Sequence, residues 1–418
     1  MASPTPATLD EARAVPLNKV QARLMEALDK PNDAGISDAV DFLICQGAYH
    51  GASDLHLEPW AEVLSLRYRI DGILQQIATI PRVQMAKIMA RIKVLADLVV
   101  YRKDVPQDGR IDADKTSCGR PMRVSSVPTV KGEKIVIRLL GERQEIYTLE
   151  TLGFQPKVVD GLRALVNRSQ GMVLLTGPSS SGKTTTIYAL LREMMDLQEN
   201  TINIVTIEDP VEYTMDRISQ IQVNPQVEFT FANALRSILR QDPEVIMVGE
   251  IRDTETAQIA TQAGLTGHFV ISTIHSGTAC GVFTRLLDMG IEPFLCASSI
   301  SGVMAQRLVR LNCPHCSQPA DPGPVLLEHF KIKGKKGKFL RGKGCAHCQG
   351  IGYRGRASLG ELLTLTPELA EHILHRPTTA HLEQLAIKAG MEPLVEDGLK
   401  KALKGITSLE ELVRVLPT

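Results

Sequence analysis

The chain has 418 residues, of which 44% are hydrophobic and 22% charged, a balance typical of globular proteins with material for two or three domains. Its 47 basic and 47 acidic side chains give a net charge of zero, so the basic excess of many nucleic-acid-binding proteins is absent. The first residues lack the basic start and apolar core of a signal peptide, and no apolar run reaches the ~18 residues of a membrane span, so we expect a cytoplasmic chain.

The N-terminal third is predicted to hold one small α/β domain. Residues 1–35, rich in Ala, Pro and charge, are expected to form a flexible or loosely attached arm with a short helix around 17–30. Between residues 36 and 141 the pattern predicts helices and alternating strands, including a hairpin with the turn Asp-Gly at 71–72. Residues 142–156 are expected to be a linker.

A second domain is predicted over residues 157–418. Helical patterns separate four short apolar runs, "GMVLLTG", "NIVTIED", "VIMVGEI" and "HFVISTI". Buried strands that alternate with helices predict a parallel sheet covered by helices on both faces. A module with two cysteine pairs, residues 311–356, interrupts this pattern, and residues 357–418 are expected to be helical.

The stretch "GPSSSGKTTT" is predicted to bind phosphate. Gly177 and the run Gly182-Lys183-Thr184 match the spacing of a phosphate-binding loop, with an apolar strand before it and a helical pattern after it. Backbone N–H groups of such a loop surround phosphate oxygens, Lys183 neutralises their charge, and Thr184 ligates Mg²⁺. The sequence therefore predicts a nucleotide site here.

Acidic residues follow two of the predicted strands. Glu250 ends "VIMVGE", where it is placed to hold Mg²⁺ through water or to polarise the attacking water; a helix N-cap is the alternative. Glu208, Asp209 and Glu212 follow "IVTI", and three acids at one strand end favour a nearby cation. Glu208 is the candidate general base, and a solvated turn stays open as the alternative.

Two histidines flank the strand "FVISTI". Strand alternation places residues seven apart on opposite faces, so His268 and His275 are not expected to act as a pair. His275, at the end of the strand, is the candidate sensor of the γ-phosphate. His268, at its start, is expected to pack or to bond elsewhere.

Cys313-Pro-His-Cys316 and Cys345-Ala-His-Cys348 form two C-x-x-C pairs. Four thiolates in this pattern suit tetrahedral Zn²⁺, and we expect a structural site because no open ligand position is evident. Their spacer is longer than usual, but a loop of that length closes at little entropic cost. Redox chemistry and replacement of one Cys by a neighbouring His are the weaker alternatives.

A basic stretch runs from Lys331 to Lys343 within this module. Phe339 is its only aromatic residue, so it lacks the interleaved aromatics of a nucleic-acid surface. We expect a solvated loop, with contact to acidic lipid headgroups as the alternative.

The order of these motifs resembles that of the type II secretion and type IV pilus assembly ATPases of the extension type, over about residues 36–418. The resemblance rests on "ASDLHLEP", "RYRIDG", "RVSSVPTVKGEKIVIRLL", the phosphate loop, "IEDPVEY", "LRSILRQDPEVIMVGEIRD", "TGHFVISTIHSGTA" and the cysteine quartet. It implies a RecA-like parallel-sheet ATPase core, a small PAS-like N-terminal α/β domain and a tetracysteine zinc module. It also implies a homo-hexameric motor that hydrolyses ATP with Mg²⁺ and associates peripherally with the inner membrane through platform and docking proteins; we do not expect a nucleic-acid partner.

The resemblance also implies roles for individual residues. Catalysis is expected from Glu250, Glu208, His275 and two arginines of the N-terminal domain, Arg123 and Arg138. An arginine on a mobile domain makes hydrolysis depend on domain closure. The expected nucleotide-binding residues are Gly177, Ser179, Ser181, Gly182, Lys183, Thr184, Thr185, Arg236, Arg240 and Arg252.

Several features depart from the family pattern. Ser180 stands where the family usually has Gly, and a positive φ there would strain it. "STIHSG" alters the residues after the histidine, and the basic pair before the Pro in "YRKDVPQDGR" is shifted. The N-terminal arm is short, so the specific secretion or pilus system stays open.

Two alternative functions remain at this stage. The zinc module and the basic stretch motivate a translocase that acts on DNA in uptake or conjugation. Ser180 and the altered flank of His275 motivate an ATP-binding assembly subunit with weak turnover.

Overall fold

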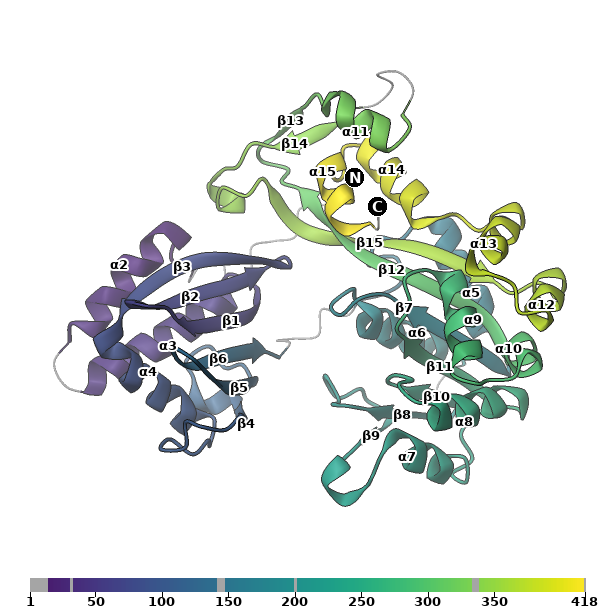
Figure 1. Cartoon of the computed structure of the whole chain (residues 1–418), viewed down its shortest axis with the longest axis horizontal. Helices are drawn as coiled ribbons and strands as arrows, with labels where there is room; N and C mark the ends of the chain where they lie inside the picture. The colour runs from purple at the N-terminus through teal and green to yellow at the C-terminus, as the bar shows by residue number, and fades with distance from the viewer. Residues whose placement is uncertain (1–13, 31–32, 141–146, 199–200, 333–337, 417–418) are drawn as a thin grey trace. The chain divides into compact units, whose positions relative to one another are not determined.

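The computed structural model describes residues 14–30, 33–140, 147–198, 201–332 and 338–416 (Figure 1). It divides into two compact units, one made of residues 1–144 with 345–350 and the other of residues 145–344 with 351–418.

The N-terminal unit is built on a six-stranded antiparallel sheet in the order β3-β2-β1-β6-β5-β4. One face carries alternate apolar side chains such as Leu55 and Leu57, which are fully buried together with side chains of the helices. The other face is polar, as expected of an antiparallel sheet covered on one side. The strands are β1 (Ala52–Pro59), β2 (Val63–Ile70), β3 (Ile73–Pro81), β4 (Gln107–Ile111), β5 (Met122–Thr129) and β6 (Gly132–Leu139). The helices are α2 (Leu17–Leu28), α3 (Asp33–Tyr49), α4 (Arg82–Leu95) and the short 3₁₀ turn η1 (Ala113–Lys115).

The predicted hairpin is confirmed. Ile70 pairs with Ile73 across a two-residue turn. Asp71 and Gly72 have φ values of 47° and 79°. Both are positive, as a type I′ turn requires, and Asp-Gly tolerates that conformation better than most dipeptides.

The predicted loose arm is wrong for the part of it that the structure describes. The helix expected around 17–30 forms as α2, but Val20 and Leu24 are fully buried. They belong to the same core as the sheet, and α2 packs on α3 and β3. Apolar side chains at helical spacing thus attach this segment firmly, whereas its Pro and charge content suggested otherwise. Residues 1–13 lie outside the described residues.

The C-terminal unit contains a seven-stranded sheet in the order β15-β12-β7-β11-β10-β8-β9. All neighbouring strands from β9 to β12 are parallel. Side chains of β7 alternate between two cores: Met172 and Leu174 pack with α7 to α10, and Val173 and Leu175 with α5 and α6. The predicted parallel sheet with helices on both faces is therefore confirmed.

The strands of this sheet are β7 (Gly171–Thr176), β8 (Ile204–Glu208), β9 (Ser219–Gln222), β10 (Val245–Val248), β11 (Phe269–Ile274), β12 (Ile300–Asn312) and β15 (Tyr353–Thr364). A separate two-stranded sheet pairs β13 (Ser317–Pro319) with β14 (Leu340–Gly342). The α-helices are α5 (Pro156–Val166), α6 (Lys183–Leu197), α7 (Phe231–Ile238), α8 (Thr254–Leu265), α9 (Ala279–Asp288), α10 (Pro293–Ser299), α11 (Gly323–His329), α12 (Pro367–Leu374), α13 (Thr379–Lys388), α14 (Leu394–Leu403) and α15 (Leu409–Val415). The 3₁₀ turn of this unit is η2 (Pro225–Val227), and η3 (Ala346–Cys348) lies in the segment 345–350 that is grouped with the N-terminal unit. Among the helices within the described ranges, none combines the length and the apolar character needed to cross a bilayer.

Two predicted boundaries need correction. Residues 357–364, expected to be helical, belong to β15, which pairs antiparallel with β12. All residues from 357 to 361 are buried, so the segment lacks the alternation by which an exposed strand is recognised. The expected linker 142–156 also carries core residues: Leu149, Leu152 and Phe154 are buried with α5 and α6.

A group of charged side chains connects α15 to the sheet through hydrogen-bonded ion pairs. Glu411 in α15 is 1% exposed, and its carboxylate accepts two hydrogen bonds from the guanidinium of Arg310 in β12, at 3.0 and 2.6 Å. Arg414 donates to the same carboxylate at 2.8 Å. Burial by itself would raise the pKa of Glu411, but the hydrogen bonds from Arg414 and Arg310 outweigh it and hold the pKa below its usual value of 4.5.

We predict that Glu411→Gln lowers the free energy of unfolding at pH 7 by about 3 kcal/mol, because it leaves the Arg310 charge without its carboxylate. Since the folded-state pKa is lowered, this stabilisation is complete above about pH 4.5 and is lost as the pH falls through the folded-state pKa. Urea unfolding followed by circular dichroism should therefore show a difference between wild type and variant that narrows below that pH. Glu410→Gln, at a surface pair with Arg341, is the control. A difference that does not vary with pH would contradict this account.

Candidate nucleotide site and cysteine cluster

The phosphate loop lies between β7 and α6, as predicted. β7 is buried along its whole length, and α6 begins at Lys183. Gly177, Ser180 and Gly182 have positive φ values of 150°, 62° and 88°. A turn of this kind directs successive backbone N–H groups toward one point, which is how such loops bind phosphate oxygens.

Ser180 occupies the strained conformation that its place in the loop suggested. Its φ of 62° lies in the left-handed region, where a non-glycine residue costs about 1–2 kcal/mol. The departure from glycine at this position is therefore tolerated by the loop at an energetic cost.

The side chains of the loop differ in their surroundings. Lys183 donates from Nζ to the carbonyl oxygens of Gly177, at 2.8 Å, and Pro178, at 3.0 Å. Burial lowers the pKa of Lys183; the Arg307 charge lowers it further, and Glu250 opposes the shift. Ser181 is buried, and its Oγ has no hydrogen-bond partner among the residues that the structure describes.

The remaining predicted binders of this loop are more open. Ser179 is exposed, and Thr184 and Thr185 in the first turn of α6 are half-buried. Ser179 belongs to the loop before Lys183, and Thr184 and Thr185 follow Lys183 in α6. Thr184 stays the candidate Mg²⁺ ligand that the motif predicts.

Glu250 follows β10, two strands from β7 in the sheet, and the acid is held by two neighbours. Arg252 donates a hydrogen bond to its carboxylate, and His275 Nε2 lies 3.8 Å from its Oε2. The hydrogen bond to Glu250 raises the pKa of Arg252. Arg252 Nη1 also lies 3.8 Å from Asp209 at the end of β8. The structure thus brings the side chains of Glu250, Arg252 and His275 together, and their roles at a nucleotide stay predictions.

Glu208 is placed differently from the prediction. It is 2% exposed, and its carboxylate accepts hydrogen bonds from the hydroxyl of Tyr188, from Thr206 Oγ1 at 2.6 Å and from Gln220 Nε2 at 3.1 Å. Burial, and then the bond to Glu208, raise the pKa of Tyr188. A buried carboxylate committed to three donors favours a structural role over the predicted general-base role.

Tyr188 and Gln220 were missed by sequence reasoning. Tyr188 lies inside the apolar helix α6, and Gln220 in the short edge strand β9. Neither position carries a local signal, because their partner Glu208 comes from a different strand. Pairing of β8 with β9, which sets Gln222 opposite Glu208, brings Gln220 into reach.

The other predicted residues bond to partners outside this group. Arg236 pairs with Glu255, and Arg240 donates from Nη1 to the carbonyl of Arg236 at 2.8 Å. His268 Nδ1 lies 3.3 Å from the carbonyl oxygen of Ala263, which agrees with the prediction that it bonds elsewhere.

Arg123 and Arg138 lie side by side on the polar face of the N-terminal sheet. They pair directly across β5 and β6, and Arg110 of β4 pairs with Arg123 in the same row. Arg138 donates from Nε to Asp54 Oδ1 at 2.9 Å, yet its side chain is 67% exposed. The register therefore places Arg123 and Arg138 next to each other on one face of the sheet.

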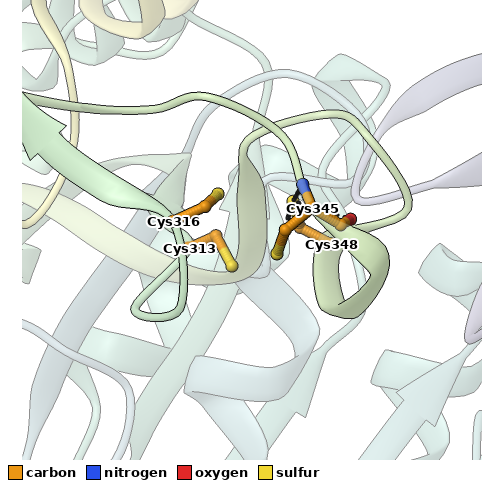
Figure 2. Close-up of side chains that lie close together, drawn as sticks. All are labelled: Cys313, Cys316, Cys345 and Cys348. Atoms are coloured by element: carbon orange, nitrogen blue, oxygen red, sulfur yellow. Dashed lines mark hydrogen bonds between the residues drawn. The ribbon is translucent and has the colours of Figure 1, made fainter.

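The four predicted cysteines form one cluster (Figure 2). The sulfur atoms of Cys313, Cys316, Cys345 and Cys348 all lie within 4.8 Å of one another, and Cys345 Sγ lies 3.7 Å from Cys348 Sγ. A tetrahedral Zn²⁺ with Zn–S bonds of about 2.3 Å places its sulfur ligands about 3.8 Å apart. Donor type, number and spacing thus fit zinc.

Comparison with known proteins identifies the family. The family model described as "Type II/IV secretion system protein" matches residues 29–414. The chain is 45% identical to the type II secretion system ATPase E of Vibrio cholerae over 391 residues, which cover 93% of this chain and 77% of that protein. It is 42% identical to the type IV pilus assembly ATPase PilB of Thermus thermophilus, over 87% of this chain and 41% of PilB.

A solved structure supports the fold. The ATPase DotB of Legionella pneumophila superposes with a TM-score of 0.66 at 20% identity, over 90% of this chain and 95% of that one. The predicted α/β fold with a parallel-sheet ATPase core is therefore confirmed. The family model covers most of the chain, and both relatives are more than 40% identical to it over the aligned residues. This chain therefore belongs to the type II/IV secretion system protein family and is an ATPase of the secretion and pilus assembly branch.

Proposed function

We propose that the chain is the ATP-hydrolysing subunit of a homo-hexameric motor, which powers type II secretion or type IV pilus assembly at the inner membrane through platform and docking proteins. The observation that carries this proposal is the convergence of the phosphate loop, Glu250 and His275 at the ends of neighbouring parallel strands. In open α/β sheets, ligands bind at the carboxyl ends of the strands. The family membership and the names of the relatives support the choice of system.

Glu250 is the residue we propose to activate the attacking water. The hydrogen bond from Arg252 orients its carboxylate. The Glu250 side chain is 20% exposed, so water can reach it. His275, 3.8 Å from the same carboxylate and exposed, is proposed to report the γ-phosphate. Glu208 is proposed to position the end of β8 through its three buried hydrogen bonds.

Lys183, Thr184 and the backbone of the loop are proposed to hold the triphosphate and its Mg²⁺. The fit is supported by the positive φ values of the loop and by the buried, unpartnered hydroxyl of Ser181 in the described part of the chain. Hydroxyl and carboxylate oxygens, here of Thr184 and Glu250, are the ligands that Mg²⁺ prefers. When bound, Mg²⁺ would neutralise charge on the phosphates.

Arg123 and Arg138 are proposed to complete the site when the N-terminal domain closes on bound nucleotide. Two adjacent guanidinium groups on one sheet face suit the charge of a terminal phosphate. Arg236 and Arg240 are proposed to contribute after release from their present partners, Glu255 and the carbonyl of Arg236. Hydrolysis that requires closure would couple turnover to motion.

The cysteine cluster is proposed to bind structural Zn²⁺. Two of its four cysteines, Cys313 and Cys348, are buried, which leaves little room for a substrate at the ion. Thiolate ligation would fasten the ends of the long 313–348 segment to each other, which no covalent bond does in the described residues.

We predict that Lys183→Ala and Glu250→Gln each reduce phosphate release by at least about 100-fold. Glu250→Gln should keep its affinity for ATP in calorimetric titration, because the loop is intact, whereas Lys183→Ala should bind ATP more weakly. Lys388→Ala, at an exposed position on α13, is the control. Normal turnover in either site variant would refute the assignment.

We predict that Arg123→Ala and Arg138→Ala lower kcat by about 10³ while changing KM little, because the arginines act on charge that develops during cleavage. Arg110→Ala, which removes the next arginine of the same row, serves as the matched control. Steady-state phosphate release measures both constants. The role of the pair is excluded if all three variants behave alike.

We predict one zinc ion per chain by mass spectrometry of the purified protein, and a loss of that zinc in Cys313→Ser and Cys348→Ser. Cys280→Ala, at a buried cysteine in α9, should retain the metal. Equal zinc content in the cluster variants and the control would rule out this site.

A further inference from the structure

The short loop that carries His275 is pinned by side chains that no motif includes. Residues 275–278 connect β11 to α9, and the imidazole of His275 is itself 60% exposed. An exposed ring on a connecting loop is not fixed by its own packing. Its aim at Glu250 must therefore come from the backbone on which it sits.

Three strands hold that backbone at successive points. In β7, Thr176 Oγ1 accepts from the N–H of Ser276 at 2.8 Å and donates to the carbonyl of Ser276 at 2.9 Å. In β12, Arg307 donates from Nη2 to the carbonyl of Gly277 at 2.9 Å. In β15, Glu361 Oε1 accepts from the N–H of Ala279 at 2.8 Å.

The sheet register explains why these three side chains converge. Ala305 of β12 pairs with Thr176 on one side and with Glu361 on the other. The side chains of Thr176, Ala305 and Glu361 therefore point to the same face of the sheet. Arg307 lies two residues further along β12 and shares that face. The three strands are neighbours in the sheet, in the order β15-β12-β7.

Thr176, Arg307 and Glu361 together form a clamp on this loop. Burying their polar and charged groups costs more free energy than a purely structural contact would need. Thr176, Arg307 and Glu361 are 0%, 8% and 3% exposed. Burying a guanidinium to satisfy backbone carbonyls costs more than an amide or hydroxyl would. Arg307 also lies against the phosphate loop, since a Cβ on Gly177 would come within 3.1 Å of its Nη1. One buried cation thus touches both the loop of Lys183 and the loop of His275.

We propose that Thr176, Arg307 and Glu361 are positioning residues, which fix the loop of His275 relative to the phosphate loop and so aim the imidazole at Glu250 and the nucleotide. This inference rests on the proposed role of His275 in hydrolysis. None of the three residues belongs to a motif, because they come from three strands far apart in the sequence.

The experiment is a set of double-mutant cycles on the full chain, with kcat and KM for MgATP as readouts. Arg307→Lys, Glu361→Gln and Thr176→Val are each made alone and together with His275→Ala. Each single variant should lose about tenfold or more in kcat with KM within about threefold. In the His275→Ala background the same changes should cost less than about twofold, because there is no imidazole left to aim.

Conservative and matched variants separate positioning from folding. Thr176→Ser keeps the hydroxyl and should retain the rate that Thr176→Val loses. Arg310→Lys changes another arginine of β12, which bonds to Glu411. This variant should be less stable to urea, but its kcat should equal that of the wild type, and adding His275→Ala should lower kcat as much as it does in the wild type. Losses of equal size with and without His275 would overturn the proposal, as would a wild-type kcat in His275→Ala. The proposed hydrolysis site fails separately, if Glu250→Gln turns over normally.

Discussion

The parallel register of β7, β10 and β11 is the constraint on which the site depends. Thr176 of β7 pairs with Ile274 of β11, so the next residue along each strand is the first glycine of the phosphate loop or His275. Val248 of β10 pairs with Ser272, which sets Glu250 at the same edge of the sheet. Because the strands are buried on both faces, a slip in register would move apolar side chains into the wrong core. Packing of the sheet therefore fixes distances between polar groups that are nearly 100 residues apart.

At this edge of the sheet, the charged side chains of Glu250 and Lys183 are each oriented by a hydrogen-bond partner. Arg252 bonds to Glu250, and the Lys183 ammonium bonds to loop carbonyls. Glu208, which the sequence suggested as the general base, is instead buried and bonded to Tyr188. Two acids at the ends of adjacent strands thus have different accessibility, and accessibility decides which of them can reach water. We therefore propose Glu250 alone as the residue that activates water.

Sequence reasoning succeeded for features that are formed by residues close together in the sequence. The phosphate loop, the Asp-Gly hairpin and the cysteine pairs depend on local geometry, and the structure contains each of them. Sequence reasoning failed where contacts between distant parts of the chain determine the structure. Residues 357–361 of β15 are all buried and so lack alternation. The buried side chains of α2 pack into the core of a sheet that lies later in the sequence.

The site shows the same division between local and long-range information. Glu250 and His275 follow apolar strands and could be recognised by position. The partners of Glu208 and the clamp formed by Thr176, Arg307 and Glu361 could not, because each partner comes from a different strand and is polar without a motif. Only the strand order places them together.

A crystal structure of the chain with Mg²⁺ and a non-hydrolysable ATP analogue tests the central claim most directly. The account predicts that the triphosphate lies in the turn from Gly177 to Thr184, with its terminal phosphate facing Glu250 and His275. A nucleotide bound elsewhere on the chain, or a terminal phosphate turned away from Glu250, would contradict it.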